Sequence, residues 1–188
     1  MEAVEFYIVG NQTCIRRGGI SKPLTEHDRE EIEFMLENMR RVFPQAVERL
    51  EQWAANSKLN RPWFEYLVVD RFIRCNFGEA DFLYSDVDDL GMFHLEEVRC
   101  PLRGICNDEG VICKPKAKLD LTDEEKRVVD LYARGLLPSE IAAKLGKAEA
   151  TCKRQLYNAC KRLKLPHPRW LIRLFSIYPV CGAQEITL

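Results

Sequence analysis

The sequence contains no long hydrophobic run. Of its 188 residues 46% are hydrophobic, but charged side chains interrupt every apolar segment. Because a membrane-spanning helix needs about 20 consecutive apolar residues, we expect no spanning segment and no membrane partner. Residues 1–5 carry acids where a signal peptide would carry bases. The sequence therefore predicts a cytoplasmic protein.

Enzyme motifs are absent as well. The sequence has no glycine-rich phosphate loop, no nucleophile paired with a base and no paired-carboxylate motif. The three histidines, His27, His94 and His167, lie in different segments, and none has a second metal ligand at a suitable spacing. We therefore expect that the chain is not an enzyme.

Disulfide bonds are not expected among the eight cysteines, because a reducing cytoplasm keeps thiols reduced. Four cysteines share one stretch, with gaps of 24, 5 and 6 residues: Cys75, Cys100, Cys106 and Cys113. Four thiolates can bind a zinc ion or an iron–sulfur cluster. The lack of tight Cys-x2–4-Cys pairs favours iron–sulfur over zinc, and reduced thiols in a loop are the alternative to a metal.

The net charge of −1 conceals an uneven distribution. Residues 1–117 carry 15 Lys and Arg against 21 Asp and Glu, a net charge of −6. Residues 118–188 carry 13 against 8, a net charge of +5. Between Lys144 and Arg173 there are nine basic residues and one acid, Glu149. A basic strip of this kind attracts polyanions such as nucleic acid.

The first 113 residues are expected to form a mainly helical domain with a minor β element. The apolar run 4–9, closed by a Gly-Asn pair, predicts one strand or a short hairpin. Apolar residues at helical spacing predict a helix from Thr25 that Pro44 interrupts and that continues to residue 53. A further helix is expected over 62–75.

Helical periodicity fails from residue 76 to residue 118. Turn formers and acids dominate this stretch, and its one strand candidate is 92–98. The acidic cluster 86–89 lacks the glycine and distal Glu of an EF-hand, so we interpret it as a solvated turn. So long an irregular segment needs something to hold it, and metal ligation by the four cysteines would supply folding energy. The lysine-rich stretch 114–118 is expected to be a linker.

Residues 119–188 predict a domain of four helices. The expected helices start near Thr122, Pro138, Glu149 and Arg169. A capping box opens the first of them, and Gly146 separates the second from the third. Cys152 and Cys160 fall on the apolar face of the third helix, where we expect them to be buried as small hydrophobic residues.

The stretch 121–165 resembles the DNA-binding domain of LuxR/FixJ-type transcriptional regulators. Residues 135–145 match the family segment Gly-Leu-x-x-x-Glu-Ile-Ala-x-x-Leu, and residues 149–153 match Glu-x-Thr-Val-Lys with Cys152 in place of Val. The resemblance implies a bacterial, cytoplasmic helix-turn-helix regulator that binds double-stranded DNA as a homodimer, with its fourth helix as the pairing element.

A recognition helix in this family lies in the major groove and presents its exposed N-terminal positions to base edges. The resemblance and the helical spacing together assign base contacts to Lys153, Arg154 and Tyr157, where Lys and Arg favour guanine. Phosphate contacts, which position the helix without reading sequence, are assigned to Thr151, Gln155, Lys161 and Arg162.

Two other interpretations stay open. The same tail is similar to region four of bacterial sigma factors, which would make RNA polymerase a partner, although the acidic first 117 residues do not supply a promoter-melting domain. The second alternative is a metal or iron–sulfur redox protein with an accessory DNA-binding tail. We expect the regulator: an N-terminal domain over 1–113 whose type the sequence does not identify, with a sensory or metal-binding role open to it, a linker over 114–118 and a helix, 149–163, that reads the major groove.

Overall fold

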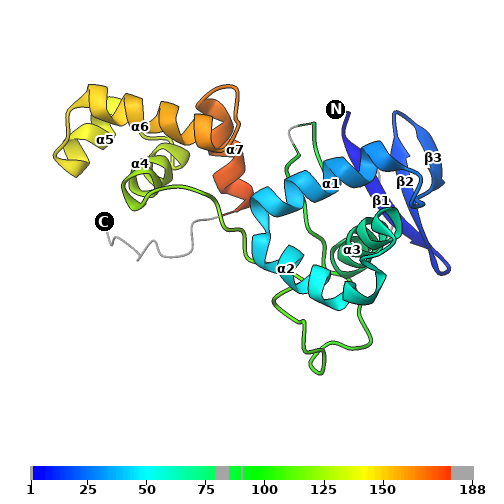
Figure 1. Ribbon diagram of the computed structural model, residues 1–188. Helices are drawn as coiled ribbons and strands as arrows, with labels where there is room; N and C mark the ends of the chain where they lie inside the picture. Colours follow the sequence, from blue (N-terminus) through cyan, green and yellow to red (C-terminus); the bar gives the residue numbers. More distant parts are fainter. Residues whose placement is uncertain (1, 79–84, 90, 179–188) are drawn as a thin grey trace. The chain divides into compact units, whose positions relative to one another are not determined.

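The computed structural model describes residues 2–78, 85–89 and 91–178. The chain divides into two compact units, Met1–Lys118 and Leu119–Leu188, which we call the first and second unit. The molecule is mainly helical, with one small antiparallel sheet, and this confirms the fold class at that level (Figure 1). In the described part of the chain no helix combines the length and apolar character needed to cross a bilayer.

A three-stranded meander opens the first unit. Strands β1 (Val4–Val9), β2 (Gln12–Arg17) and β3 (Ile20–Pro23) pair antiparallel in the order β1-β2-β3. Glycines with positive φ make both turns, Gly10 in the first and the Gly18-Gly19 pair in the second. The sequence predicted one strand or a short hairpin, and β3 is the addition.

Three α-helices and a 3-10 turn follow the sheet. They are α1 (Arg29–Val42), α2 (Pro44–Trp53), η1 (Ala55–Ser57) and α3 (Arg61–Asn76). Pro44 is the first residue of α2, which confirms that it ends one helix and begins another. The predicted helix over 62–75 is α3, and it packs against β1 and β2. The Thr13 hydroxyl donates a 2.5 Å hydrogen bond to Asp70 across this contact.

Aromatic side chains from separate segments join in the core of the first unit. Phe43 lies between α1 and α2, and its ring centroid is 5.7 Å from that of Phe72 on α3. Phe93, from the irregular segment, is 5.3 Å from Phe43. Phe77, just after α3, stacks on Phe6 of β1 at 5.8 Å. All five rings are almost fully buried, so burial of aromatic surface connects sheet, helices and loop.

The irregular segment is a folded part of the first unit. Between residues 77 and 122 the described residues contain only isolated β-bridges and turns. The predicted strand over 92–98 is therefore wrong. Phe93 makes a single bridge, to Val87, and Val87 in turn pairs with Val4 of β1. The segment touches the sheet through one isolated bridge to β1, and its described residues add no strand to the sheet.

The interpretation of the acidic cluster 86–89 as a solvated turn is wrong for two of its acids. Asp86 and Asp88 are only 2% and 4% exposed. The Asp86 carboxylate accepts the Phe6 amide at 2.5 Å, and the Asp88 carboxylate accepts the Met92 amide at 2.9 Å. Asp86 takes the place of a strand partner at the edge of β1 and Asp88 closes the turn to Met92, because a buried backbone N–H must find an acceptor.

The second unit contains four helices. They are α4 (Asp123–Ala133), α5 (Pro138–Leu145), α6 (Glu149–Arg162) and α7 (Arg169–Ile177). The expected capping box is present at α4: the Thr122 hydroxyl accepts the Glu125 amide at 3.2 Å, and the Glu125 carboxylate accepts the Thr122 amide at 2.9 Å. Helix α4 packs against both α6 and α7. The core residues include Leu121, Val128, Ile141, Leu156 and Leu171.

The boundary between the units falls at the end of the expected linker. Residues 114–118 have no regular secondary structure but belong to the first unit. The Lys118 amide donates to the Val42 carbonyl at 2.8 Å, and the Lys114 amide donates to the Asn76 side chain at 2.9 Å. Pro115 between them is buried. The stretch is thus attached to the first unit at both ends.

Candidate nucleic-acid interface

A tight turn joins α5 to α6. Helix α5 ends at Gly146, which has left-handed dihedrals (φ 62°, ψ 36°), and the Gly146 amide donates to the Ala142 carbonyl. A non-glycine residue in this conformation is strained by its Cβ. Helix α6 begins at Glu149, three residues after Gly146, so α5 and α6 are held in contact over a very short connection.

The start of α6 has only backbone capping. Ala148 is the N-cap, and its side chain has no oxygen that could accept a hydrogen bond. The Ala148 carbonyl accepts the amides of Thr151 and Cys152, at 3.0 and 3.2 Å. Glu149 in the first turn adds a carboxylate at the positive end of the helix dipole.

Helix α6 has one buried and one exposed face. The buried face consists of Cys152, Leu156, Ala159 and Cys160. Both cysteines lie in the core as predicted, and burial raises the pKa of the Cys160 thiol to about 11, which keeps it neutral. The exposed face consists of Lys153, Arg154, Tyr157, Asn158, Lys161 and Arg162. All three residues that the sequence assigned to base contacts are therefore on the solvent side of the helix.

The exposed residues differ in their present ion pairs. The Lys153 ammonium lies 2.7 Å from the Glu149 carboxylate one turn earlier. Arg154 and Lys161 have no carboxylate within 4 Å among the residues that the structure describes. Tyr157 is 65% exposed, although it is aromatic. An exposed large aromatic beside unpaired cations is a feature of surfaces that bind nucleic acid.

The residues assigned to phosphate contacts are less uniform. Lys161 is exposed one turn after Tyr157, whereas Thr151 and Gln155 are half-buried. The Gln155 side-chain oxygen accepts a hydrogen bond from Lys147 at 3.4 Å. The Arg162 guanidinium lies 3.4 Å from the buried Glu125 carboxylate of the α4 capping box. Gln155 and Arg162 are thus partly engaged within the second unit.

Two further polar residues lie near this face and were not among the predicted contacts. Asn158 is exposed and follows Arg154 by one helical turn, a spacing that sequence periodicity alone would have indicated. Lys147 in the turn contacts the Glu124 carboxylate. That hydrogen bond is the largest cause that holds the pKa of Glu124 below its ordinary value. Lys147 links the turn to the start of α4.

The four predicted metal-ligating cysteines lie in the first unit. Cys75 is in the last turn of α3, and the other three are in the irregular segment. Cys100 is exposed, while Cys75, Cys106 and Cys113 are half-buried, and all are free thiols. Among the described residues, no three His, Cys, Asp or Glu side chains are arranged closely enough to hold a single metal ion.

Comparisons of the chain with protein-family models, with curated proteins and with solved structures found no match.

Proposed function

We propose that the chain is a sequence-specific, DNA-binding transcriptional regulator that inserts α6 into the major groove. The observation that supports this most strongly is the exposed face of α6, where Lys153, Arg154 and Tyr157 project together. The opposite face packs against α4 and α5. A supported helix with a basic outer face has the shape and charge that the major groove accepts.

The three outward residues differ in how readily they bind bases. Arg154, which lacks a carboxylate partner in the described chain, offers its guanidinium to the O6 and N7 acceptors of guanine. Lys153 must leave Glu149, but an exposed i,i+4 pair is worth only about 0.3–0.5 kcal/mol. A good base contact is worth about 1–3 kcal/mol, so we expect the Lys153 ammonium to leave Glu149 for a base. Tyr157 presents an apolar ring and a hydroxyl to the groove wall.

Phosphate contacts complete the proposed interface. Lys161 lies one turn beyond Tyr157 and is exposed, so it suits the backbone beside the groove. Arg162 holds the buried Glu125 through its Nε, and its two terminal nitrogens are left to donate to a phosphate. Thr151 and Gln155 are at the edge of the same face. These contacts fix register and carry no sequence information.

We also propose that the regulator binds as a homodimer, because two half-sites multiply specificity. The outer side of α7 supports this: Ile172 is 39% exposed, and the Arg173 guanidinium lies 5.6 Å from the centre of the Trp170 ring. The inner side of the same helix, with Leu171, Leu174 and Phe175, is buried. Exposed Ile172 is suited to pair with the same helix of a second copy.

The decisive experiment selects duplexes from a randomised pool with the full chain and then measures affinity at several salt concentrations. We expect an enriched motif with two symmetric half-sites and two chains per duplex. The double variant Lys153→Ala, Arg154→Ala should bind at least about 10-fold more weakly and reduce the salt slope by about 1–2. Arg40→Ala, an exposed arginine of α1, is the matched control and should leave both values unchanged.

Two results would contradict the proposal. Unchanged affinity and salt slope in the double variant would remove α6 from the interface. Binding that needs RNA polymerase core enzyme would instead support the alternative that the second unit acts like region four of a sigma factor.

A further inference from the structure

Hydrogen bonds of the first unit connect the segments that carry its four cysteines, beginning with Cys75 and Cys113. The residue after Cys75 is Asn76, which is fully buried. Its side-chain nitrogen donates to the Ile112 carbonyl and its oxygen accepts the Lys114 amide, both at 2.9 Å. Asn76 therefore grips the chain on both sides of Cys113. These bonds hold Cys113 beside the end of α3.

A second attachment brings the Cys106 turn to the same helix. Asp108 is only 9% exposed and accepts hydrogen bonds from Arg49 at 2.6 Å and from Arg71. Arg71 lies on α3 one turn before Cys75. The Asp108 carbonyl in turn accepts the Ile112 amide at 2.9 Å. The buried carboxylate thus attaches the loop between Cys106 and Cys113 to α2 through Arg49 and to α3 through Arg71.

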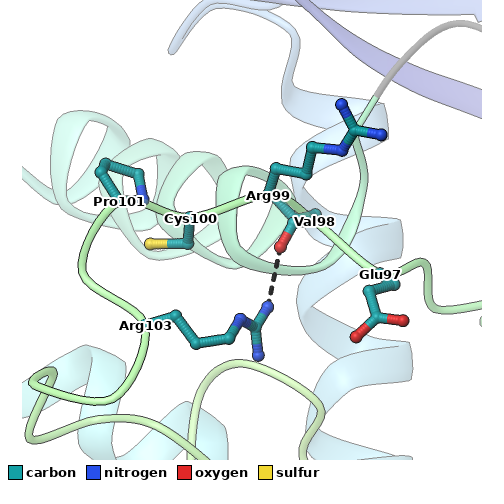
Figure 2. A pocket seen from close by; sticks show the side chains of 6 residues that line it. All are labelled: Glu97, Val98, Arg99, Cys100, Pro101 and Arg103. Atoms are coloured by element: carbon teal, nitrogen blue, oxygen red, sulfur yellow. Dashed lines mark hydrogen bonds between the residues drawn. The ribbon is translucent and has the colours of Figure 1, made fainter.

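Cys100 is linked to Cys106 by tight turns. The Arg103 amide donates to the Cys100 carbonyl at 3.2 Å, and the Cys106 amide donates to the Leu102 carbonyl at 3.0 Å. Figure 2 shows the Cys100 thiol and the Arg103 side chain at one hollow, with Arg103 donating to the Val98 carbonyl at 2.7 Å. The loop from 97 to 103 therefore presents an accessible thiol at this hollow.

The interaction of the thiols with one another supports their proximity. Burial is the main cause that raises the pKa of Cys75 to about 11; Arg71 lowers it, and the thiols of Cys113, Cys100 and Cys106 each raise it. All three thiols therefore lie within electrostatic range of Cys75. They are nonetheless not close enough for any three ligands to share one ion, within the described residues.

We propose that Cys75, Cys100, Cys106 and Cys113 bind an iron–sulfur cluster. Tetrahedral zinc would need its sulfur ligands about 3.8 Å apart, given Zn–S bonds of about 2.3 Å, and no such set is present among the described residues. A cluster does not need its thiolates to meet at one ion, because they bind different iron atoms. Each thiol releases its proton on binding, and the cation of Arg71 offsets part of the negative charge.

A cluster at this site explains how the irregular segment from Cys100 to Cys113 stays ordered, which DNA binding by α6 does not explain. The chain from Cys100 to Cys113 is held by turns, with one isolated bridge from Glu109 to Cys113. It also exposes apolar side chains, including Ile105 at 78%. Ligation at four points would supply the ordering energy that regular structure provides elsewhere. The inference stands on the first unit alone and does not depend on DNA binding.

The test is iron and acid-labile sulfide analysis of the full chain, purified anaerobically and reconstituted with ferrous iron, ferric iron and sulfide. We expect iron and sulfide in equal amounts, about two or about four of each per chain, and a visible charge-transfer absorption that bleaches on reduction. Cys100→Ser should lose nearly all of both ions while it keeps the far-UV circular dichroism of the metal-free chain, since Cys100 is exposed. Cys14→Ala, at a buried cysteine of β2, should retain the cluster.

Three outcomes would overturn the proposal. The first is a reconstituted chain that holds neither iron nor sulfide. The second is stoichiometric zinc with no iron, which would make the site mononuclear. The third is full cluster content in Cys100→Ser and in a second variant, Cys106→Ser. None of these outcomes bears on DNA binding by α6, so the two proposals fail separately.

Discussion

Single buried polar side chains carry much of the organisation of the first unit. Asn76 and Asp108 are almost inaccessible to solvent, and each bonds to segments far apart in the sequence. Nothing in the local sequence marks them, because Asn and Asp are ordinarily exposed. Their importance comes from what they satisfy: backbone groups of an irregular segment that has no strand partner.

Asn76→Ala should therefore destabilise the first unit. The substitution leaves the Ile112 carbonyl and the Lys114 amide without their partner, and an unsatisfied buried polar group costs about 1–3 kcal/mol. We expect a loss of about 2–4 kcal/mol in the free energy of unfolding, measured by urea denaturation. Asn158→Ala, an exposed asparagine of α6, is the control and should change it by less than about 0.5 kcal/mol. Equal losses in both variants would contradict the role of Asn76.

At the scale of elements, local signals anticipated the helices better than the connections. Helices α2 and α4 begin where predicted, because Pro44 and the capping box at Thr122 favour a helix start through local interactions alone. The strand expected over 92–98 failed because a strand needs a neighbour. β1 reaches this segment only through Val87. Pairing over a long sequence separation is decided by tertiary packing, which apolar alternation does not encode.

The α5–α6 turn depends on one left-handed residue. Gly146→Ala meets no atom within 4 Å, so its cost is backbone strain alone, about 1–2 kcal/mol. Thermal unfolding of the second unit should show this loss, while Gly146→Asn should cost less because asparagine tolerates the conformation. DNA affinity at temperatures where the variant is folded should be retained. A larger loss for Asn than for Ala would contradict the argument.

At the scale of the whole molecule, charge separates the two units. The acidic first 117 residues owe part of their stability to carboxylates paired with arginine. Burial alone would raise the pKa values of Asp108 and Glu65, but hydrogen bonds from arginines outweigh it and hold both pKa values below the ordinary 3.8 and 4.5. The partners are Arg49 and Arg71 for Asp108, and Arg29 and Arg61 for Glu65.

Acid should therefore weaken the first unit. A carboxylate whose pKa is lower in the folded than in the unfolded chain contributes fully to folding stability above its ordinary pKa. That contribution is lost as the pH falls through the pKa of the folded state. We expect the stability that these groups contribute to be constant above about pH 5 and to decline below about pH 4. Near-UV circular dichroism as a function of pH measures this decline. Asp108→Asn should be less stable at neutral pH and show a shallower acid decline. An acid decline identical to that of the unaltered chain would exclude this role for Asp108.

The sequence by itself determined the helices, the faces they bury and the split between an acidic and a basic part, because these depend on periodicity, capping and composition within short stretches. Cys152 on the inner face of α6 and Arg154 on its outer face are examples. Only the tertiary structure decided what holds the irregular segment: Asp86 at the edge of β1, Asn76 on both sides of Cys113, and Asp108 against arginines of α2 and α3. Those contacts satisfy buried polar groups over separations of tens of residues, and no local pattern specifies such partners.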